Sequence, residues 1–323
     1  MAMKKYLVII LGLILLVGMH IVWAQRTGRR GISESRNRGN QRGRGNIGGR
    51  GNMGGRGDYG GQRNFRGRDL RAGVPDWEVD EEFSEDVFTF VRIRYDSRRV
   101  YGRNYGGRGR NRRSSGSYIM NYDWDTDYPD SDLNISFRLQ QLTSMEVDPD
   151  GLVLDLTDER LFDYPFIYLI EPGDLVFRES ELLPLRKYLL NGGFLMVDDF
   201  WGEAEWENFY GEIKRVFPER EPVDLTIDHK IFSAVFELKE KPQVCSYENW
   251  SSTGRTWERD DAKEVHFRAM YDDKGRMMMI ICHNTDLGDG WEREGVNEQY
   301  FRLFSEPKSY PMGINIIFYA MTH

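Results

Sequence analysis

From residue 87 onward, the apolar positions follow patterns that predict strands and helices in turn. The run FTFVRIRY (residues 88–95) is rich in β-branched and aromatic residues and predicts a strand. In DSDLNISFRLQQLTSM, Ile135, Leu139 and Leu142 share one stripe, which predicts a helix. LVLDL and PFIYLIE then predict two strands. PFIYLIE is almost wholly apolar, as expected for a strand covered on both faces.

The same alternation continues to the last residue. A helix is predicted over residues 179–191, where Gly192 and Gly193 end it, followed by the strand FLMV and a helix over residues 203–216. VDLTIDHKIF predicts a loop or a short strand, HFRAMYDDKGRMMMIICHN a hairpin, and PMGINIIFYAMTH a helix with Pro311 in its first turn. Strands separated by helices indicate a mainly parallel sheet with helices on both faces, the three-layer α/β class.

The first residues have the pattern of an export signal. Lys4 and Lys5 precede an apolar run, and Val22 and Ala24 give the small-residue ending that signal peptidase requires. We expect residues 1–24 to be a signal peptide cleaved after Ala24. The alternative is an anchor retained in the membrane over residues 6–23, whose length approaches that of a span. Both alternatives predict an exported protein, periplasmic or extracellular, that touches the membrane only through this segment.

Charge is strongly segregated along the chain. The net charge is −8, yet residues 26–73 contain thirteen Arg and three acidic residues, so residues 74–323 carry −20. We expect a disordered Arg/Gly-rich linker over residues 25–83, because it has too few apolar residues to offset its ordering entropy, and an α/β domain over residues 84–323. A second basic block, residues 98–116, has seven Arg and no acid and predicts a mobile loop inside that domain.

The Arg/Gly-rich composition also indicates partners. It is typical of nucleic-acid-binding tails, but export makes nucleic acid an unexpected target. An envelope protein, a glycan or another anionic surface is the expected partner, held by salt-sensitive contacts.

Acidic residues follow several of the predicted strands. In an open parallel sheet, ligands bind beyond the carboxyl ends of the strands, so these residues are expected to converge. Carboxylates in this arrangement suit a divalent cation such as Ca²⁺ or Mg²⁺, for which Asp198, Asp199 and Asp286 are the candidates. Catalytic candidates are Asp198, Asp199 and His283. The expected ligand-binding residues are Asp96, Glu171, Asp198, Asp199, Trp201, Glu203, Asn284, Asp286 and Asp289.

Structural explanations compete with each of these assignments. Asp199 or Glu203 could serve only to cap the following helix. The acidic segment YDWDTDYPDSD resembles a calcium loop but lacks the central Gly and terminal Glu of an EF-hand, so a solvated loop with a helix cap is the alternative. The two cysteines, Cys245 and Cys282, could pair in an oxidising compartment or remain small buried hydrophobes.

Taken together, a series of ordered motifs resembles the bacterial domain of unknown function 4159 family. The motifs are WDTDYPDSDLN, RLQQLTSM, FDYPFIYLIEPG, LRKYLLNGGFLMVDDFWGE, DHKIF, CHNTDLGDGWE and YPMGINIIFYAMTH, and the resemblance spans residues 88–323. It implies membership of the class I glutamine-amidotransferase-like superfamily and a flavodoxin-like sheet. Working members of that superfamily carry a nucleophilic Cys at a strand-to-helix elbow, followed later by His and Glu.

This chain departs from the amidotransferase pattern. FLMV continues into Asp198, Asp199 and Phe200 with no Cys at that turn. The resemblance therefore favours a non-catalytic, extracytoplasmic protein that binds a ligand or takes part in envelope assembly. The alternative is a metal- or carboxylate-dependent hydrolase acting on an envelope or carbohydrate substrate.

Overall fold

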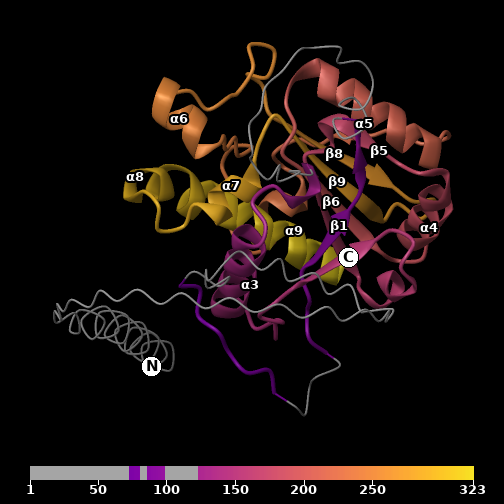
Figure 1. The fold of residues 1–323 in the computed structure, drawn as a ribbon, viewed down its shortest axis with the longest axis horizontal. Coiled ribbons are helices and arrows are strands. Elements are labelled where there is room, and N and C mark those ends of the chain that lie inside the picture. Colours follow the sequence, from indigo (N-terminus) through magenta and orange to yellow (C-terminus); the bar gives the residue numbers. More distant parts are fainter. Residues whose placement is uncertain (1–72, 81–85, 99–122) are drawn as a thin grey trace, which may run out of the picture. The chain divides into compact units, whose positions relative to one another are not determined.

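A computed structural model describes residues 73–80, 86–98 and 123–323 and shows a mixed α/β protein (Figure 1). The predicted signal segment, most of the Arg/Gly-rich linker and all of the basic loop except Arg98 lie outside these residues. Those three assignments stay predictions. Within the described ranges, no helix has both the length and the apolar character needed to cross a membrane.

The centre of the fold is a seven-stranded sheet. Its strand order is β3-β1-β4-β6-β9-β8-β7, and the first five strands are parallel, whereas β8 and β7 are added antiparallel at one edge. The predicted mainly parallel sheet is thus confirmed. The strands are β1 Val91–Arg94, β3 Leu152–Asp155, β4 Phe166–Ile170, β6 Phe194–Asp198, β7 Val223–Asp224, β8 His266–Tyr271 and β9 Met277–His283.

Both faces of this sheet are covered, because alternate side chains enter two separate hydrophobic clusters. Phe90 and Tyr168 belong to one cluster, together with residues of α3, α7 and α9. Val91 and Ile167 belong to the other, with residues of α4 and α5. In Figure 1, α3, α7 and α9 accordingly lie to one side of the central strands and α4 and α5 to the other. The helices are α3 Asp130–Leu142, α4 Glu179–Leu190, α5 Gly202–Val216, α6 Tyr247–Thr253, α7 Leu287–Glu292, α8 Glu298–Tyr300 and α9 Tyr310–Thr322.

Most of the predicted elements appear within a residue or two of their expected ends. The wholly apolar strand is β4, which is buried along its full length, and the predicted hairpin is β8 and β9. Several features were not predicted, among them the short helices α6, α7 and α8. Asp96–Ser97 forms a short strand, β2, that pairs with β5 (Leu175–Val176) outside the main sheet, and a π-helix, Phe301–Ser309, leads directly into α9.

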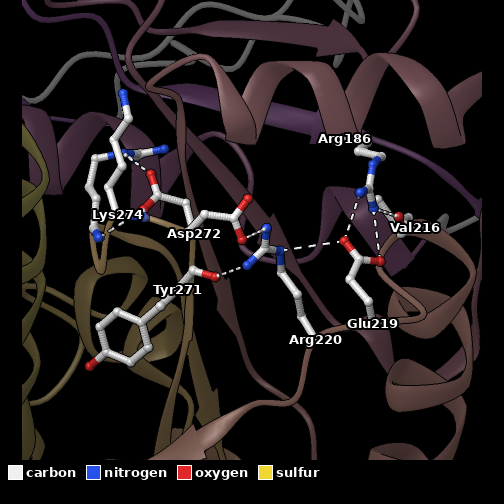
Figure 2. Close-up of polar contacts among 9 residues, drawn as sticks. Arg186, Val216, Glu219, Arg220, Tyr271, Asp272 and Lys274 are labelled. Carbon is white, nitrogen blue, oxygen red and sulfur yellow. Dashed lines mark hydrogen bonds and ion pairs between the residues drawn. The ribbon is translucent and has the colours of Figure 1, made fainter.

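Ion pairs join the elements at the end of the sheet where β9 begins (Figure 2). Arg220 donates to the carbonyl oxygen of Tyr271 (3.0 Å) and pairs with Asp273 in the hairpin turn (2.8 Å). Arg186 of α4 pairs with Glu219, beyond the end of α5 (2.6 Å). Such partly exposed pairs contribute about 0–1 kcal/mol each, so their role here is to fix the mutual placement of helix and hairpin. The opposite end of the sheet, where β9 ends, carries the acidic residues.

Candidate functional site

A cavity of about 310 Å³ lies at the carboxyl ends of the parallel strands. Glu171 follows β4 into its wall, Asp199 follows β6, and Asp286 comes three residues after β9. Asp127 joins them from the turn after the 3₁₀-helix Asp123–Asp125. This is the position at which open parallel sheets bind ligands. The other lining residues are Thr126, Trp201, Glu205, Ser246, Glu248, Glu258, Arg259, Asp289 and Arg293.

Three of the lining acids have a left-handed backbone. Their φ angles are 61° at Asp127, 53° at Glu171 and 57° at Asp199. The one other non-glycine residue with positive φ in the described ranges is Asn284, just after β9. Residues with a Cβ rarely adopt this conformation, which costs on the order of 1–3 kcal/mol each. Strain concentrated around one cavity is typical of a binding or catalytic site.

The carboxylates of Asp127, Asp199 and Asp286 converge. One oxygen from each lies within 4.8 Å of the other two, close enough to bind one cation. Oδ1 of Asp199 accepts a hydrogen bond from Trp201 Nε1 (3.0 Å), and Oδ1 of Asp286 accepts one from the amide of Asp289 (2.7 Å). Their second oxygens accept no hydrogen bond from the described residues, although Asp199 is only 6% exposed and Asp286 4%. Oδ2 of Asp127 is likewise buried without a donor among them.

The electrostatics of this group, which we call the carboxylate triad, favour a bound cation. Burial raises the pKa of Asp199 and of Asp286 well above the usual value. The negative charge of Asp127 raises both further, as does that of Glu171 for Asp199 and that of Asp199 for Asp286. The pKa of Asp127 is raised in the same way, by burial and by the nearby Asp289 and Glu292. Without a cation, the ionised triad is therefore strongly disfavoured in the folded state.

Arg92 holds the turn that carries Asp127. Its guanidinium is fully buried, pairs with Asp132 (2.5 Å) and donates to the carbonyl oxygens of Trp124 and Thr126. The backbone on the N-terminal side of Asp127 is thereby tied to strand β1. Asp132 and Asp127, both in the acidic segment of the sequence, thus have different roles: one pairs with Arg92 and the other lines the cavity.

The structure brings five of the predicted ligand-binding residues together in the cavity wall: Glu171, Asp199, Trp201, Asp286 and Asp289. Trp201 is only 4% exposed and belongs to the hydrophobic core, and its indole N–H holds Asp199. It therefore orients a carboxylate rather than offering an open ring face for stacking.

Asp198 lies beneath the cavity and not in its wall. Its Oδ2 accepts hydrogen bonds from the amides of Leu287 and Gly288 and from the Tyr168 hydroxyl. Burial raises its pKa to about 7, although these hydrogen bonds act to lower it. Asp198 is the last residue of β6 and Asp199 follows the strand with φ of 57°, and of the two only Asp199 lines the cavity. Asp198 anchors the start of α7.

His283 also lies outside the cavity wall. Its Nε2 is 3.1 Å from the carbonyl oxygen of Gly202, and its Nδ1 is 3.0 Å from Nη1 of Arg268. Because Arg268 can only donate, Nδ1 accepts and Nε2 carries the proton. Burial lowers the pKa of His283 to about 4, so the ring is neutral at pH 7. These contacts place His283 in a packing role.

The remaining predicted site residues lie elsewhere. Asn284 accepts a hydrogen bond from the amide of Gly202 and donates to the carbonyl oxygen of Glu264, so it fixes the turn before α5. Glu203 is exposed in the first turn of α5, and Asp96 lies in β2, 3.6 Å from Arg178. Cys245 and Cys282 are both buried as free thiols.

The sequence analysis did not identify several of the residues that line the cavity. Asp127 was noticed only as part of a weak calcium-loop pattern. Glu248, Glu258 and Arg259 belong to a segment around α6 that no strand or helix signal marks. Glu205 and Arg293 sit one helical turn or more from the strand ends. The excess of acid in these segments was the one available signal.

The fold and site thus define a mixed α/β protein with an acidic cavity at the carboxyl ends of its parallel strands. The family described as Domain of unknown function (DUF4159) matches residues 114–321, and the chain belongs to this family. A search of curated proteins found no match.

Proposed function

We propose that this domain is a non-catalytic binding domain whose acidic cavity holds a divalent cation, Ca²⁺ or Mg²⁺, and through it a ligand. The observation that carries the proposal is the convergence of Asp127, Asp199 and Asp286 from three separate segments, with a buried oxygen of Asp127, Oδ2, that accepts no hydrogen bond from the described residues. Hard divalent cations prefer such a set of carboxylate oxygens. A cation would also remove the repulsion that raises the pKa of each member of the triad.

Thermal unfolding of the full chain tests this proposal. Metal is first removed with a chelator, and CaCl2 or MgCl2 is then titrated in. The cation should raise the Tm, and at a concentration 100 times the Kd it should increase the free energy of unfolding by about 2.7 kcal/mol. Asp127→Asn should abolish the shift. Asp260→Asn, at a side chain that is 94% exposed, should keep it. A wild-type Tm that no divalent cation changes would rule out the site.

We further infer that the domain is a flavodoxin-like, three-layer member of the glutamine-amidotransferase-like superfamily. Support comes from the five parallel strands. If they are numbered 1 to 5 along the chain, their order across the sheet is 2-1-3-4-5, which is the flavodoxin-like order. Asp199 follows β6 with φ of 57° and directly precedes the turn into α5. This is the kind of elbow at which the superfamily carries its nucleophilic Cys. An experimental structure with a different strand order would remove this assignment.

The position of Asp199 also favours a second function, hydrolysis with Asp199 as general base. Its strained backbone presents a carboxylate of raised pKa to the cavity. Turnover of a glycoside, ester or amide that disappears in Asp199→Asn would establish this alternative in place of pure binding. Absence of turnover across a broad panel would leave the binding role.

We propose that the Arg/Gly-rich residues 26–73 attach this protein, once exported, to an anionic surface of the cell envelope. Thirteen Arg in this segment, against an acidic remainder, support a salt-sensitive electrostatic contact. The full chain should sediment with vesicles containing phosphatidylglycerol at low salt and be released at high salt. A chain lacking residues 26–73 should fail to sediment. Equal sedimentation of both chains would leave this segment as a spacer.

A further inference from the structure

A second group of acids adjoins the carboxylate triad. One carboxylate oxygen from each of Asp127, Asp289 and Glu292 lies within 4.8 Å of the other two. Asp289 and Glu292 are three residues apart in α7, so their side chains project from the same face of that helix. Asp127 belongs to both groups.

The positive charge supplied by the protein to this second group is small. Arg293 contacts Asp289 (3.3 Å), Glu292 (2.8 Å) and Glu248 (3.0 Å), so one guanidinium is shared among three carboxylates. The cavity wall as a whole has eight carboxylates and two arginines, so one divalent cation would leave it negative.

Two buried oxygens in this group have unused hydrogen-bonding capacity. Oδ2 of Asp127 and Oε2 of Glu292 accept no hydrogen bond from the described residues. Oε2 of Glu292 has Nε of Arg293 at 2.8 Å, but as an ion pair whose orientation does not make a hydrogen bond. Buried acceptors in native proteins are normally satisfied, and a bound ion is one accepted reason for an exception.

We propose that the cavity binds two divalent cations, bridged by the carboxylate of Asp127. Asp199 and Asp286 hold the first, and Asp289 and Glu292 hold the second, with Arg293 displaced from its contact with Glu292. The proposal rests on the proposed cation-binding function and extends it to a paired centre, in which a carboxylate shared by two ions keeps them close enough to bind one ligand together.

Manganese bound to the full chain provides the test, because Mn²⁺ takes oxygen ligands and is paramagnetic. At saturation, equilibrium dialysis should find two ions per wild-type chain, and the electron paramagnetic resonance spectrum should show exchange coupling between them. Glu292→Gln should bind one ion and give the six-line spectrum of isolated Mn²⁺. Glu298→Gln, at an exposed side chain, should behave as wild type.

A further variant examines Arg293 itself. Arg293→Gln removes a positive charge beside the second ion and should tighten its binding by about tenfold. One ion per wild-type chain, or two ions retained in Glu292→Gln, would overturn the paired centre and leave the single-cation function intact. A wild-type chain that binds no Mn²⁺, Ca²⁺ or Mg²⁺ would overturn both.

Discussion

At the scale of single residues, Gly288 shows how little space surrounds the carboxylate triad. A Cβ at this position would lie 2.9 Å from Oδ2 of Asp127 and 2.9 Å from the Tyr168 hydroxyl. Gly288→Ala should therefore displace Asp127, weaken Ca²⁺ or Mg²⁺ binding and destabilise the fold by about 1–3 kcal/mol.

Gly211 provides the matched control for this substitution. It lies within α5, and a Cβ there would meet nothing within 4 Å. Gly211→Ala should leave cation binding unchanged and add about 0.5–1 kcal/mol of stability, because Ala favours the helix. Urea unfolding and calorimetric titration of both variants measure the two effects. Equal cation affinity in Gly288→Ala and wild type would show that Asp127 is not positioned as described.

Removing the negative charge of Asp286 should stabilise the cation-free protein. Its pKa is raised in the folded state, so the ionised carboxylate opposes folding above its unfolded pKa. Asp286→Asn keeps an oxygen that can accept the hydrogen bond from the amide of Asp289. The variant should increase the free energy of unfolding by about 0.5–2 kcal/mol at pH 7.5, because residues at functional sites often reduce stability.

Asp132 is the contrasting carboxylate, because it pairs with the buried Arg92. Asp132→Asn should destabilise by about 3–5 kcal/mol, since a buried guanidinium loses its counter-charge. Denaturation in a chelator-containing buffer distinguishes the two variants. If Asp286→Asn were also strongly destabilising, its carboxylate would be structural.

At the scale of elements, α7 depends on Asp198 for its position. This six-residue helix carries Asp289 and Glu292, and its first amides donate to Oδ2 of Asp198. Asp198→Ala leaves the amides of Leu287 and Gly288 and the Tyr168 hydroxyl without a partner, which should cost about 2–4 kcal/mol. Hydrogen exchange at Leu287 and Gly288 should accelerate.

Asp198→Asn separates the hydrogen bonds from the charge. The amide oxygen can still accept from α7, so exchange at Leu287 and Gly288 should remain close to wild type. Rapid exchange in Asp198→Asn as well would mean that the charge, and not the acceptor, holds α7.

At the scale of the whole molecule, two sets of buried groups should give opposite pH dependences. The pKa of His283 is about 4 in the folded protein and about 6.5 when unfolded, so the native state takes up fewer protons between these values. Stability from this residue is complete above about pH 6.5 and falls by about 3 kcal/mol as the pH drops to 4. The raised carboxyl pKa values of the triad act in the other direction, because their protonation favours the cation-free folded state.

The His283→Gln variant isolates the first contribution. The carboxyl groups titrate alike in both proteins, so the difference in unfolding free energy between variant and wild type should change by about 2–3 kcal/mol from pH 7 to pH 4.5. Urea unfolding across this range provides the measurement. A difference that does not vary with pH would show that His283 is protonated in the native state or exposed.

Much of the α/β architecture was predictable from the sequence, because strand and helix periods are local properties. The buried strand β4, the helix α4 ended by Gly192, and the β8–β9 hairpin all follow from runs of a few residues. Four of the cavity-lining residues were found by one rule, that ligands bind after the strands of a parallel sheet, and Trp201 was found as an aromatic residue beside those carboxylates.

Local sequence by itself determined the strands, the helices and the acidity of the strand ends, because each depends on neighbouring residues. Tertiary structure decided which acids face the cavity. Asp198 and Asp199 are adjacent and chemically identical, yet Asp198, the last residue of β6, lies beneath α7, whereas Asp199, just beyond the strand with φ of 57°, lines the cavity. Asp127 reaches the triad from a turn fixed by Arg92, and α7 brings Glu292 to the second group of acids, contacts that depend on strand order and helix packing over long separations in the chain.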